Sequence, residues 1–313
     1  MGELKEFKSF FKTVGGNEGG KCHYPTRLDT YGCGCQHDCS YCYAKSLLNF
    51  RKLWDFQNPA VADISKIRRK IEKLPDNIPV IRLGGMTDCF QPIELDNKVT
   101  YETIKALNAK KQPYLIVTKS EIVAYDEYLE IMDKDLAHIQ ITITCFDDDM
   151  YRDLAYEKAV PPSRRIWAVE RLYDAGFDVQ VRLSPFIPEF VDYDRLASIK
   201  CDKLIVEFLR VNTWIKKWFD IDFGKYTLVH GGYSHMPLEM KKDYISKIYG
   251  FKEISVCEDE DTAYKYWKYH FNSDPKDCCN LHLSFWKDVE LEPEESFMNC
   301  KNSETGQNTK KLF

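Results

Sequence analysis

The sequence lacks the marks of several protein classes. Its 313 residues contain no apolar run near the roughly 18 residues that span a membrane, and residues 1–12 lack the apolar core of a signal peptide. The net charge of −5 and the pI near 5.9 leave no overall basic surface for duplex DNA. Internal repeats are also missing. We therefore predict a globular, cytoplasmic protein with no membrane partner.

Cysteine, in contrast, is abundant, with 12 residues. In a large chain without an export signal, cysteine indicates metal or redox chemistry rather than disulfides. Cys35, Cys39 and Cys42 have the spacing C-x3-C-x2-C, and thiolates suit zinc and iron–sulfur clusters. Zinc would want a second close pair of ligands, and an electron-transfer cluster a fourth Cys. Zinc, a redox pair and chance remain open. Three ligands on one loop favour a [4Fe–4S] cluster with one open iron, and we expect Cys22 and Cys33 to be bystanders near it.

Strand and helix patterns alternate along the chain. We predict strands at residues 27–31, 79–83, 114–118, 138–144, 179–183 and 203–211. Helices are predicted at residues 43–53, 61–73, 94–109, 125–132, 161–175, 193–199, 238–249 and 261–270, with a short strand at 253–256. Six βα units favour an α/β fold with a parallel sheet, whereas a complete barrel needs eight. The prediction is a partial (βα)6 barrel of the TIM type with a C-terminal α/β extension.

The pattern also predicts four regions. Residues 1–24 form an N-terminal lead-in, 25–212 the barrel, 213–301 the C-terminal extension and 302–313 a polar, mobile tail. A strand leads directly into the cysteine loop, as expected at the mouth of a barrel, where strand ends carry the chemistry.

With Tyr41 before Cys42, the cysteine loop reads C-x3-C-x-aromatic-C, which resembles the signature of the radical S-adenosylmethionine superfamily. The resemblance implies a [4Fe–4S] cluster whose open iron binds the amino and carboxylate groups of S-adenosylmethionine. It also implies an external electron donor of the flavodoxin or ferredoxin kind. The electron cleaves the sulfonium and generates a 5′-deoxyadenosyl radical. Tyr41 and Tyr43 would shield the cluster.

Later motifs resemble the spore photoproduct lyase branch of this superfamily over about residues 25–212. They are Thr-Asp-Cys-Phe-Gln-Pro at 87–92, Val-Thr-Lys at 117–119, Thr-Ile-Thr at 142–144, Glu157, Pro162-Ser163-x-Arg165, Gly176 and Pro185-Phe-Ile-Pro188. The resemblance implies that Lys119 and Thr142 contact S-adenosylmethionine and that Ser184 lies beside its adenosyl group. Arg182 would pair with the methionine carboxylate in a bidentate fork, or belong to an ordinary ion pair.

Glycines in the loop after the second strand let backbone groups approach a ligand closely, and the resemblance implies that this loop binds the amino group of S-adenosylmethionine. Its candidate residues are Gly84, Gly85, Thr87 and Asp88. One position departs from the branch: spore photoproduct lyases carry a hydrogen-donating cysteine in this loop, where this chain has Gly85. Cys89 follows the loop and could replace that donor, or it could face the core as free cysteines often do.

We expect the radical to attack a nucleic-acid base or nucleotide, for repair or modification. The aromatic and basic run from Trp214 to Tyr226 could stack the bases of single-stranded or damaged nucleic acid, or it could be the core that joins the extension to the barrel. A peptide- or metabolite-modifying radical enzyme is the alternative, which the acidic pI favours. An iron–sulfur redox sensor is a third, and the loop at residues 84–88 argues against it.

Further cysteines lie near the C-terminus, at Cys257, Cys278, Cys279 and Cys300. Adjacent residues of a strand or helix point to different faces, and no standard spacing supports a ligand set of Cys257, Cys278, His282 and Cys300. We therefore expect this C-terminal part of the chain to bind no metal and to dock against the barrel through Trp267, Tyr269 and Phe271.

Overall fold

The computed structural model describes residues 7–11, 21–154, 156–258 and 260–282. The helices and strands named below lie within residues 1–281, which form one unit. Most of the predicted lead-in, the predicted tail at 302–313 and Cys300 lie outside the described residues.

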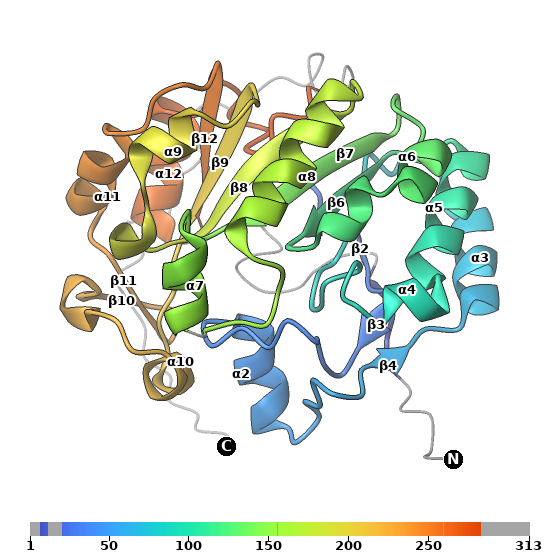
Figure 1. Cartoon of the computed structure of the whole chain (residues 1–313), viewed down its shortest axis with the longest axis horizontal. Coiled ribbons are helices and arrows are strands. Elements are labelled where there is room, and N and C mark those ends of the chain that lie inside the picture. The colour runs from blue at the N-terminus through green and yellow to red at the C-terminus, as the bar shows by residue number, and fades with distance from the viewer. Residues whose placement is uncertain (1–6, 12–20, 155, 259, 283–313) are drawn as a thin grey trace, which may run out of the picture. The chain divides into compact units, whose positions relative to one another are not determined.

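A parallel sheet forms the centre of this unit (Figure 1). Its strands are β2 (Arg27–Leu28), β5 (Ile81–Leu83), β6 (Tyr114–Thr118), β7 (Ala137–Ile143), β8 (Asp178–Phe186), β9 (Lys203–Phe208) and β12 (Glu253–Cys257), in this order. Strand β1 (Phe10–Phe11) pairs antiparallel with β2. Among the described strands, β1 and β12 lie at opposite ends of the order and do not pair, so the sheet is open. The prediction of an α/β partial barrel is confirmed.

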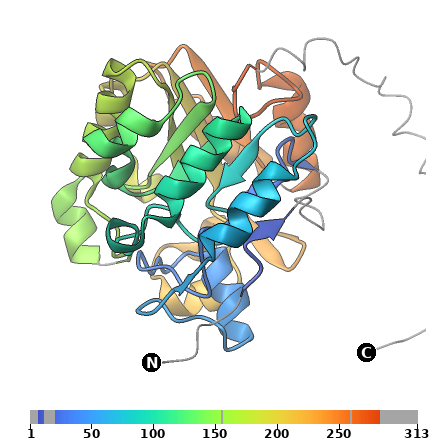
Figure 2. The same ribbon diagram turned by 90° about the vertical axis from the view of Figure 1, so that its right-hand side faces the viewer.

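The strands of the sheet are mostly apolar, as expected for a parallel sheet that is covered by helices. Every residue of β7 is buried, as expected for a central parallel strand. The helices are α2 (Tyr43–Phe50), α3 (Ile64–Glu72), α4 (Glu94–Asn97), α5 (Val99–Lys110), α6 (Asp126–Ile131), α7 (Asp148–Leu154), α8 (Pro162–Asp174), α9 (Tyr193–Ala197), α10 (Thr213–Trp218), α11 (Leu238–Ile245) and α12 (Asp261–His270). Figure 2 shows α3 and α5 side by side on the outer face of the sheet.

Local chemistry sets the ends of these helices. The Asp63 carboxylate accepts hydrogen bonds from the first turn of α3, and Ile67 and Ile71 lie four residues apart on the buried face. Helix α8 begins with a proline in its first turn, and Gly176, with a φ of 79°, follows its end. The predicted helix at 94–109 is divided at Lys98, whose φ is 53°.

Several elements were not predicted, among them α7, α10 (Thr213–Trp218) and the strands of one hairpin. Helix α7 starts after Asp147, whose carboxylate accepts hydrogen bonds from the backbone of Asp149 and Met150. A hairpin forms from β10 (Leu228–His230) and β11 (Tyr233–His235) around the predicted Gly231–Gly232 turn. The small strands β3 (Tyr31–Gly32) and β4 (Ala60–Val61) pair with each other.

The C-terminal extension continues the sheet. Strand β12 pairs in parallel with β9, and α11 and α12 lie beside it in Figure 1. The predicted docking against the barrel is confirmed for Trp267. Trp267 is buried and stacks on Phe208 of β9, and Phe271 packs against Trp267. Tyr269 is 36% exposed, so its predicted docking role is wrong; it lies two residues after Trp267, on another side of α12.

Truncation of Trp267 should therefore destabilise the chain. We expect Trp267→Ala to lower the free energy of unfolding by about 3–5 kcal/mol, because a large buried side chain is lost. Tyr269→Ala is the matched control and should change it by less than about 0.5 kcal/mol. Urea unfolding of both variants measures the difference, and equal losses would contradict the docking through Trp267.

Candidate active site

One cavity of about 190 Å³ brings together almost all of the predicted site residues. The cysteine loop and the segments at the ends of β5 to β9 line it, as expected where parallel strands end. The predicted residues among its lining are Cys35, Cys39, Tyr41, Cys42, Gly84, Gly85, Thr87, Asp88, Lys119, Thr142, Arg182 and Ser184. Cys89 does not line the cavity. It is fully buried in the hydrophobic core, so the structure does not place its thiol as a hydrogen donor.

The three loop thiols lie close enough to interact electrostatically. Cys42 caps the start of α2, where its sulfur accepts a hydrogen bond from the Lys45 N–H at 3.4 Å. Burial raises the pKa of all three thiols. Within the described ranges, no three His, Cys, Asp or Glu side chains are already arranged around a metal ion. A bound iron–sulfur cluster fits this donor set, because its positive charge would stabilise the thiolates that burial otherwise opposes.

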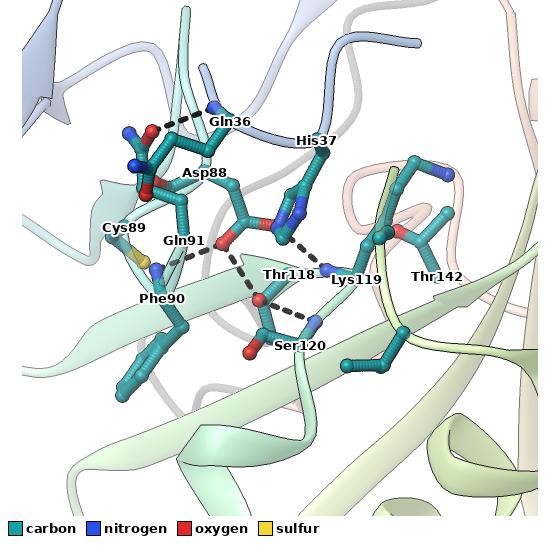
Figure 3. Close-up of polar contacts among 12 residues, drawn as sticks. Gln36, His37, Asp88, Cys89, Phe90, Gln91, Thr118, Lys119, Ser120 and Thr142 are labelled. Carbon is teal, nitrogen blue, oxygen red and sulfur yellow. Dashed lines mark hydrogen bonds and ion pairs between the residues drawn. The ribbon is translucent and has the colours of Figure 1, made fainter. Parts of the chain in front are cut away.

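The Asp88 carboxylate ties the cysteine loop to β6 (Figure 3). One oxygen accepts hydrogen bonds from the Thr118 hydroxyl at 2.7 Å and the Phe90 N–H at 2.8 Å. The other accepts from the Lys119 N–H at 2.7 Å and lies 3.2 Å from Nε2 of His37. Burial alone would raise the pKa of Asp88, but His37 and these donors lower it. Asp88 was predicted to bind a ligand; its contacts are those of a residue that positions the loop.

The glycine loop needs its small residues. Gly84 has a φ of 81°, and a Cβ there would lie 2.8 Å from the Val117 carbonyl oxygen. A Cβ on Gly85 would lie 2.8 Å from Cδ of Arg27. The buried Asp29 carboxylate accepts hydrogen bonds from Gly85 N–H at 2.7 Å and Met86 N–H at 2.9 Å. The loop backbone is therefore held against the wall of the cavity.

Glu157 is a central residue of the site that the sequence analysis did not assign. Its carboxylate accepts hydrogen bonds from Arg165 and from the Tyr41 hydroxyl, and it lies 3.3 Å from the Cys39 sulfur and 3.5 Å from Nζ of Lys119. Burial opposes its ionisation, but Arg165 and Lys119 lower the pKa of Glu157 to about 2. The signal for its role was its place in the motif string, beside Arg165.

Lys119 extends along the wall of the cavity. Its ammonium lies 3.3 Å from the Thr144 hydroxyl and 3.5 Å from the Ser184 carbonyl oxygen, and 5.1 Å from the centre of the Tyr41 ring. Thr142, two residues before Thr144, also lines the cavity and is buried. The Lys119 contacts to uncharged oxygens are long, so a ligand with an anionic group can replace them at small cost.

Arg182 takes part in an internal ion pair, which was the alternative to the predicted fork. Its guanidinium donates hydrogen bonds to Gln140 at 2.8 Å and to Glu207 at 2.5 Å, and the Ser184 hydroxyl donates to the same Glu207 carboxylate at 2.8 Å. Although burial opposes it, Arg182 lowers the pKa of Glu207 to about 2. With two nitrogens engaged, Arg182 is not available as a bidentate fork. A carboxylate in the apolar strand β9 was the sequence signal for this pair.

Residues 30–200 match the family model described as the Radical SAM superfamily, which is more than half of the chain. The chain belongs to the radical S-adenosylmethionine superfamily. Members of this superfamily are enzymes that use S-adenosylmethionine and an iron–sulfur cluster.

The chain is also similar to individual known proteins. The chain is 28% identical over 173 residues to the uncharacterized protein MJ0683 of Methanocaldococcus jannaschii, an alignment over 53% of this chain and 62% of that protein. It thus spans less than two thirds of that relative. Spore photoproduct lyase complexed with dinucleoside spore photoproduct is similar in structure, with a TM-score of 0.54 at 16% identity over 79% of this chain and 75% of that one. A mutant lyase with bound AdoMet and the same dinucleoside gives 0.51 over 73% and 74% at 16% identity. At such identity these matches show a shared fold.

A search for membrane spans in the described part of the chain finds no helix with the length and apolarity to cross a bilayer.

Removal of the Glu157 charge should destabilise the fold strongly. We expect Glu157→Gln to cost about 3–5 kcal/mol at neutral pH, because Arg165 and Lys119 would stay buried beside an uncharged amide. The Glu157 pKa of about 2 lies below the ordinary value of 4.5. Its stabilisation is therefore present above pH 4.5 and is lost as the pH falls toward 2.

The measurement is urea unfolding of wild type and variant at several pH values. The difference between them should shrink as the pH falls below 4.5. Glu239→Gln, which removes a carboxylate that is 83% exposed and paired with Lys242, is the control and should cost no more than about 1 kcal/mol. A difference that does not change with pH would contradict the assignment to Glu157.

Proposed function

We propose that this chain binds a [4Fe–4S] cluster through Cys35, Cys39 and Cys42 and cleaves S-adenosylmethionine to act on a nucleic-acid base or nucleotide. The observation that carries the proposal is the single cavity in which these thiols meet Lys119, Thr142 and Ser184. When bound, the cluster supplies the electron, received from an external flavodoxin- or ferredoxin-like donor, that splits the sulfonium into methionine and a 5′-deoxyadenosyl radical, which abstracts hydrogen from the substrate.

The chain's own residues bind and orient the ligand. Lys119 offers a cation to an anionic group such as the methionine carboxylate, since Arg182 is occupied by Glu207. The backbone of Gly84 and Gly85 gives a close approach without side chains. Thr142 and Ser184 line the same wall and offer hydroxyl groups.

Aromatic rings exclude water from the cysteine loop. Tyr41, Tyr156, Phe190 and Phe219 pack against one another with ring centroids 5.3–5.9 Å apart, and each of the four is buried. A dry wall protects a radical from side reactions. Phe219 and Tyr226 of the aromatic and basic run are buried, so this part of the run belongs to the core.

The rest of that run supports a nucleobase substrate. Trp214 and Trp218 of α10 are half-buried, with ring centroids 5.5 Å apart. The ammonium of Lys217 lies 5.2 Å from the Trp214 ring, and that of Lys45 lies 5.0 Å from the Trp218 ring. Helix α10 begins three residues after Arg210, which lines the cavity. Rings with cations beside them are the means by which proteins bind single-stranded nucleic acid.

The dinucleoside in the spore photoproduct lyase structures is in line with a nucleotide substrate.

The source of the hydrogen that is given back to the substrate radical is a separate question. Among the described residues that line the cavity, the cysteines are Cys35, Cys39 and Cys42 alone. We therefore do not propose a return of hydrogen from a cavity thiol, and modification of a base is favoured over repair of a thymine dimer. A peptide or metabolite is the alternative substrate.

Lys119 should be required for cleavage of S-adenosylmethionine. We expect Lys119→Met to weaken its binding about 10- to 100-fold, since hydrogen bonds to charged groups contribute about 1.5–3 kcal/mol. The measurement is 5′-deoxyadenosine formed by the anaerobically reconstituted, reduced protein at several concentrations of S-adenosylmethionine.

The control variant is Lys111→Met, which removes a lysine that is 77% exposed and paired with Asp133. Iron content separates loss of the cluster from loss of ligand binding: it should be unchanged in Lys119→Met and lost when Cys35, Cys39 and Cys42 are all changed to Ala. Reduced wild-type protein that forms no 5′-deoxyadenosine would refute the proposal in favour of a redox sensor.

Oligonucleotide binding should depend on α10. We expect Trp214→Ala and Trp218→Ala each to weaken binding of single-stranded DNA about 10- to 100-fold, because stacking contributes about 1–3 kcal/mol per base. Lys217→Met should reduce the dependence of binding on salt. Fluorescence anisotropy at two or more salt concentrations measures both.

Trp167→Ala is the matched control. Trp167 lies on α8 with Arg164 and Arg171 over its ring, but it does not line the cavity. Its loss should leave binding unchanged. Equal effects at Trp167 and Trp214 would indicate nonspecific adsorption, and tight binding of a peptide or metabolite in place of DNA would overturn the nucleobase substrate.

A further inference from the structure

A second cavity lies beside the first and contains a cluster of cysteines. Cys22, Cys257, Cys278 and Cys279 all line it. They come from three separate segments: the chain before β2, the end of β12 and the turn after α12. Arg182 and Glu207 line both cavities, so their ion pair stands between the cysteine cluster and the candidate active site.

The four thiols lie close together. The neighbouring thiols of Cys257 and Cys279 raise the pKa of the Cys278 thiol, and burial together with Cys279 and Cys257 raises the pKa of Cys22. Cys257 is the parallel partner of Glu207 across β12 and β9, so both side chains point to the same face of the sheet. All four thiols are free of disulfides. Cys22 was expected near the loop cysteines, but it lines this cavity instead.

The turn that carries Cys278 and Cys279 is rigidly built. The fully buried Asp277 carboxylate accepts hydrogen bonds from Cys279 N–H at 3.1 Å and Leu281 N–H at 2.7 Å. The Ser255 hydroxyl donates to the Cys278 carbonyl oxygen at 2.6 Å. Because the two cysteines lie in a turn and not in a strand or helix, the alternation that separates adjacent side chains does not apply to them.

Four thiols that border one cavity from three segments are donors suited to a soft metal. Metal binding would have to draw them together, because no three of them are arranged around one ion in the described residues. Thiolates bind zinc at about 2.3 Å in a tetrahedral site, and they also hold iron–sulfur clusters. Such a centre with four thiolates is negatively charged, and Arg82 and Arg182 line the same cavity. We propose that Cys22, Cys257, Cys278 and Cys279 bind a second metal centre, either one zinc ion or an iron–sulfur cluster. The proposal replaces the expectation that the tail binds no metal, which was reached without Cys22.

The centre would join distant parts of the chain. Residue 22 precedes the first parallel strand, whereas Cys278 and Cys279 follow the last described helix. Metal binding would therefore fix both to the sheet beside β12 and add to the free energy of folding. Its charge would also act on the Arg182–Glu207 pair, which lines the same cavity.

The experiment uses the full chain with Cys35, Cys39 and Cys42 changed to Ala, so that the first site does not contribute metal. This variant is supplied anaerobically with Zn²⁺, or with iron and sulfide, and metal is measured after removal of the excess. We expect about one zinc or up to about four irons per chain. Mössbauer spectra and metal content distinguish the two kinds of centre.

Two further variants test the ligands. Adding Cys257→Ser and Cys278→Ser should abolish the bound metal, whereas adding Cys145→Ser and Cys201→Ser should not, because these buried cysteines lie outside the cavity. X-ray absorption of the metal-loaded protein gives a test that does not require the serine variants to fold. A shell of sulfur ligands supports the site. A shell of oxygen and nitrogen, no metal at all, or metal that survives loss of Cys257 and Cys278 would overturn it.

Discussion

The carboxylate of Asp88 fixes the relation between the cysteine loop and the sheet. A loop of three cysteines has no regular structure to hold it, and its position depends on contacts from outside. Asp88 bonds to the end of β6 through Thr118 and Lys119 and meets His37 inside the loop. Gln36 and Gln91 add a second tie, since the Gln36 N–H donates to Gln91 at 2.9 Å. If Asp88 turned away, the three thiols and Lys119 would no longer face one cavity.

Buried ion pairs build the rest of the cavity wall. Glu157 with Arg165 and Lys119 closes one side, and Glu207 with Arg182 closes the other. Such pairs add little net stability, because desolvation offsets most of the attraction. These pairs do fix the orientation of the side chains, since each carboxylate accepts several hydrogen bonds at once. The site thus combines a rigid frame with a cation, Lys119, whose contacts to uncharged oxygens are long enough to be exchanged for a ligand.

Patterns within one segment predicted well. The apolar runs of β6 and β7 and the proline and glycine that flank α8 carry local signals, so those elements were found within one or two residues. The spacing of Cys35, Cys39 and Cys42 is local too. Contacts between distant segments left weaker signals. The carboxylate of Glu207 stands out in the apolar strand β9, but it is 25 residues from its partner Arg182. Cys22 lies near cysteines that follow it by more than two hundred residues. The role of Cys89 could not be chosen from the sequence, because residue order shows only that it follows the loop. The structure shows that its side chain is buried in the core.

The Arg182–Glu207 pair links the two cavities electrostatically. On one side, Arg182 interacts electrostatically with the thiols of Cys257 and Cys279. On the other side, the Ser184 hydroxyl donates a hydrogen bond to Glu207. Negative charge gathered at the cysteines would draw the guanidinium toward them, and the Glu207 carboxylate would then depend more on the Ser184 hydroxyl and on Arg210. A charged centre at the four cysteines would therefore alter the wall where Ser184 lies without touching the ligand itself. The C-terminal extension, which was predicted to dock against the barrel, would in this way take part in shaping the candidate active site.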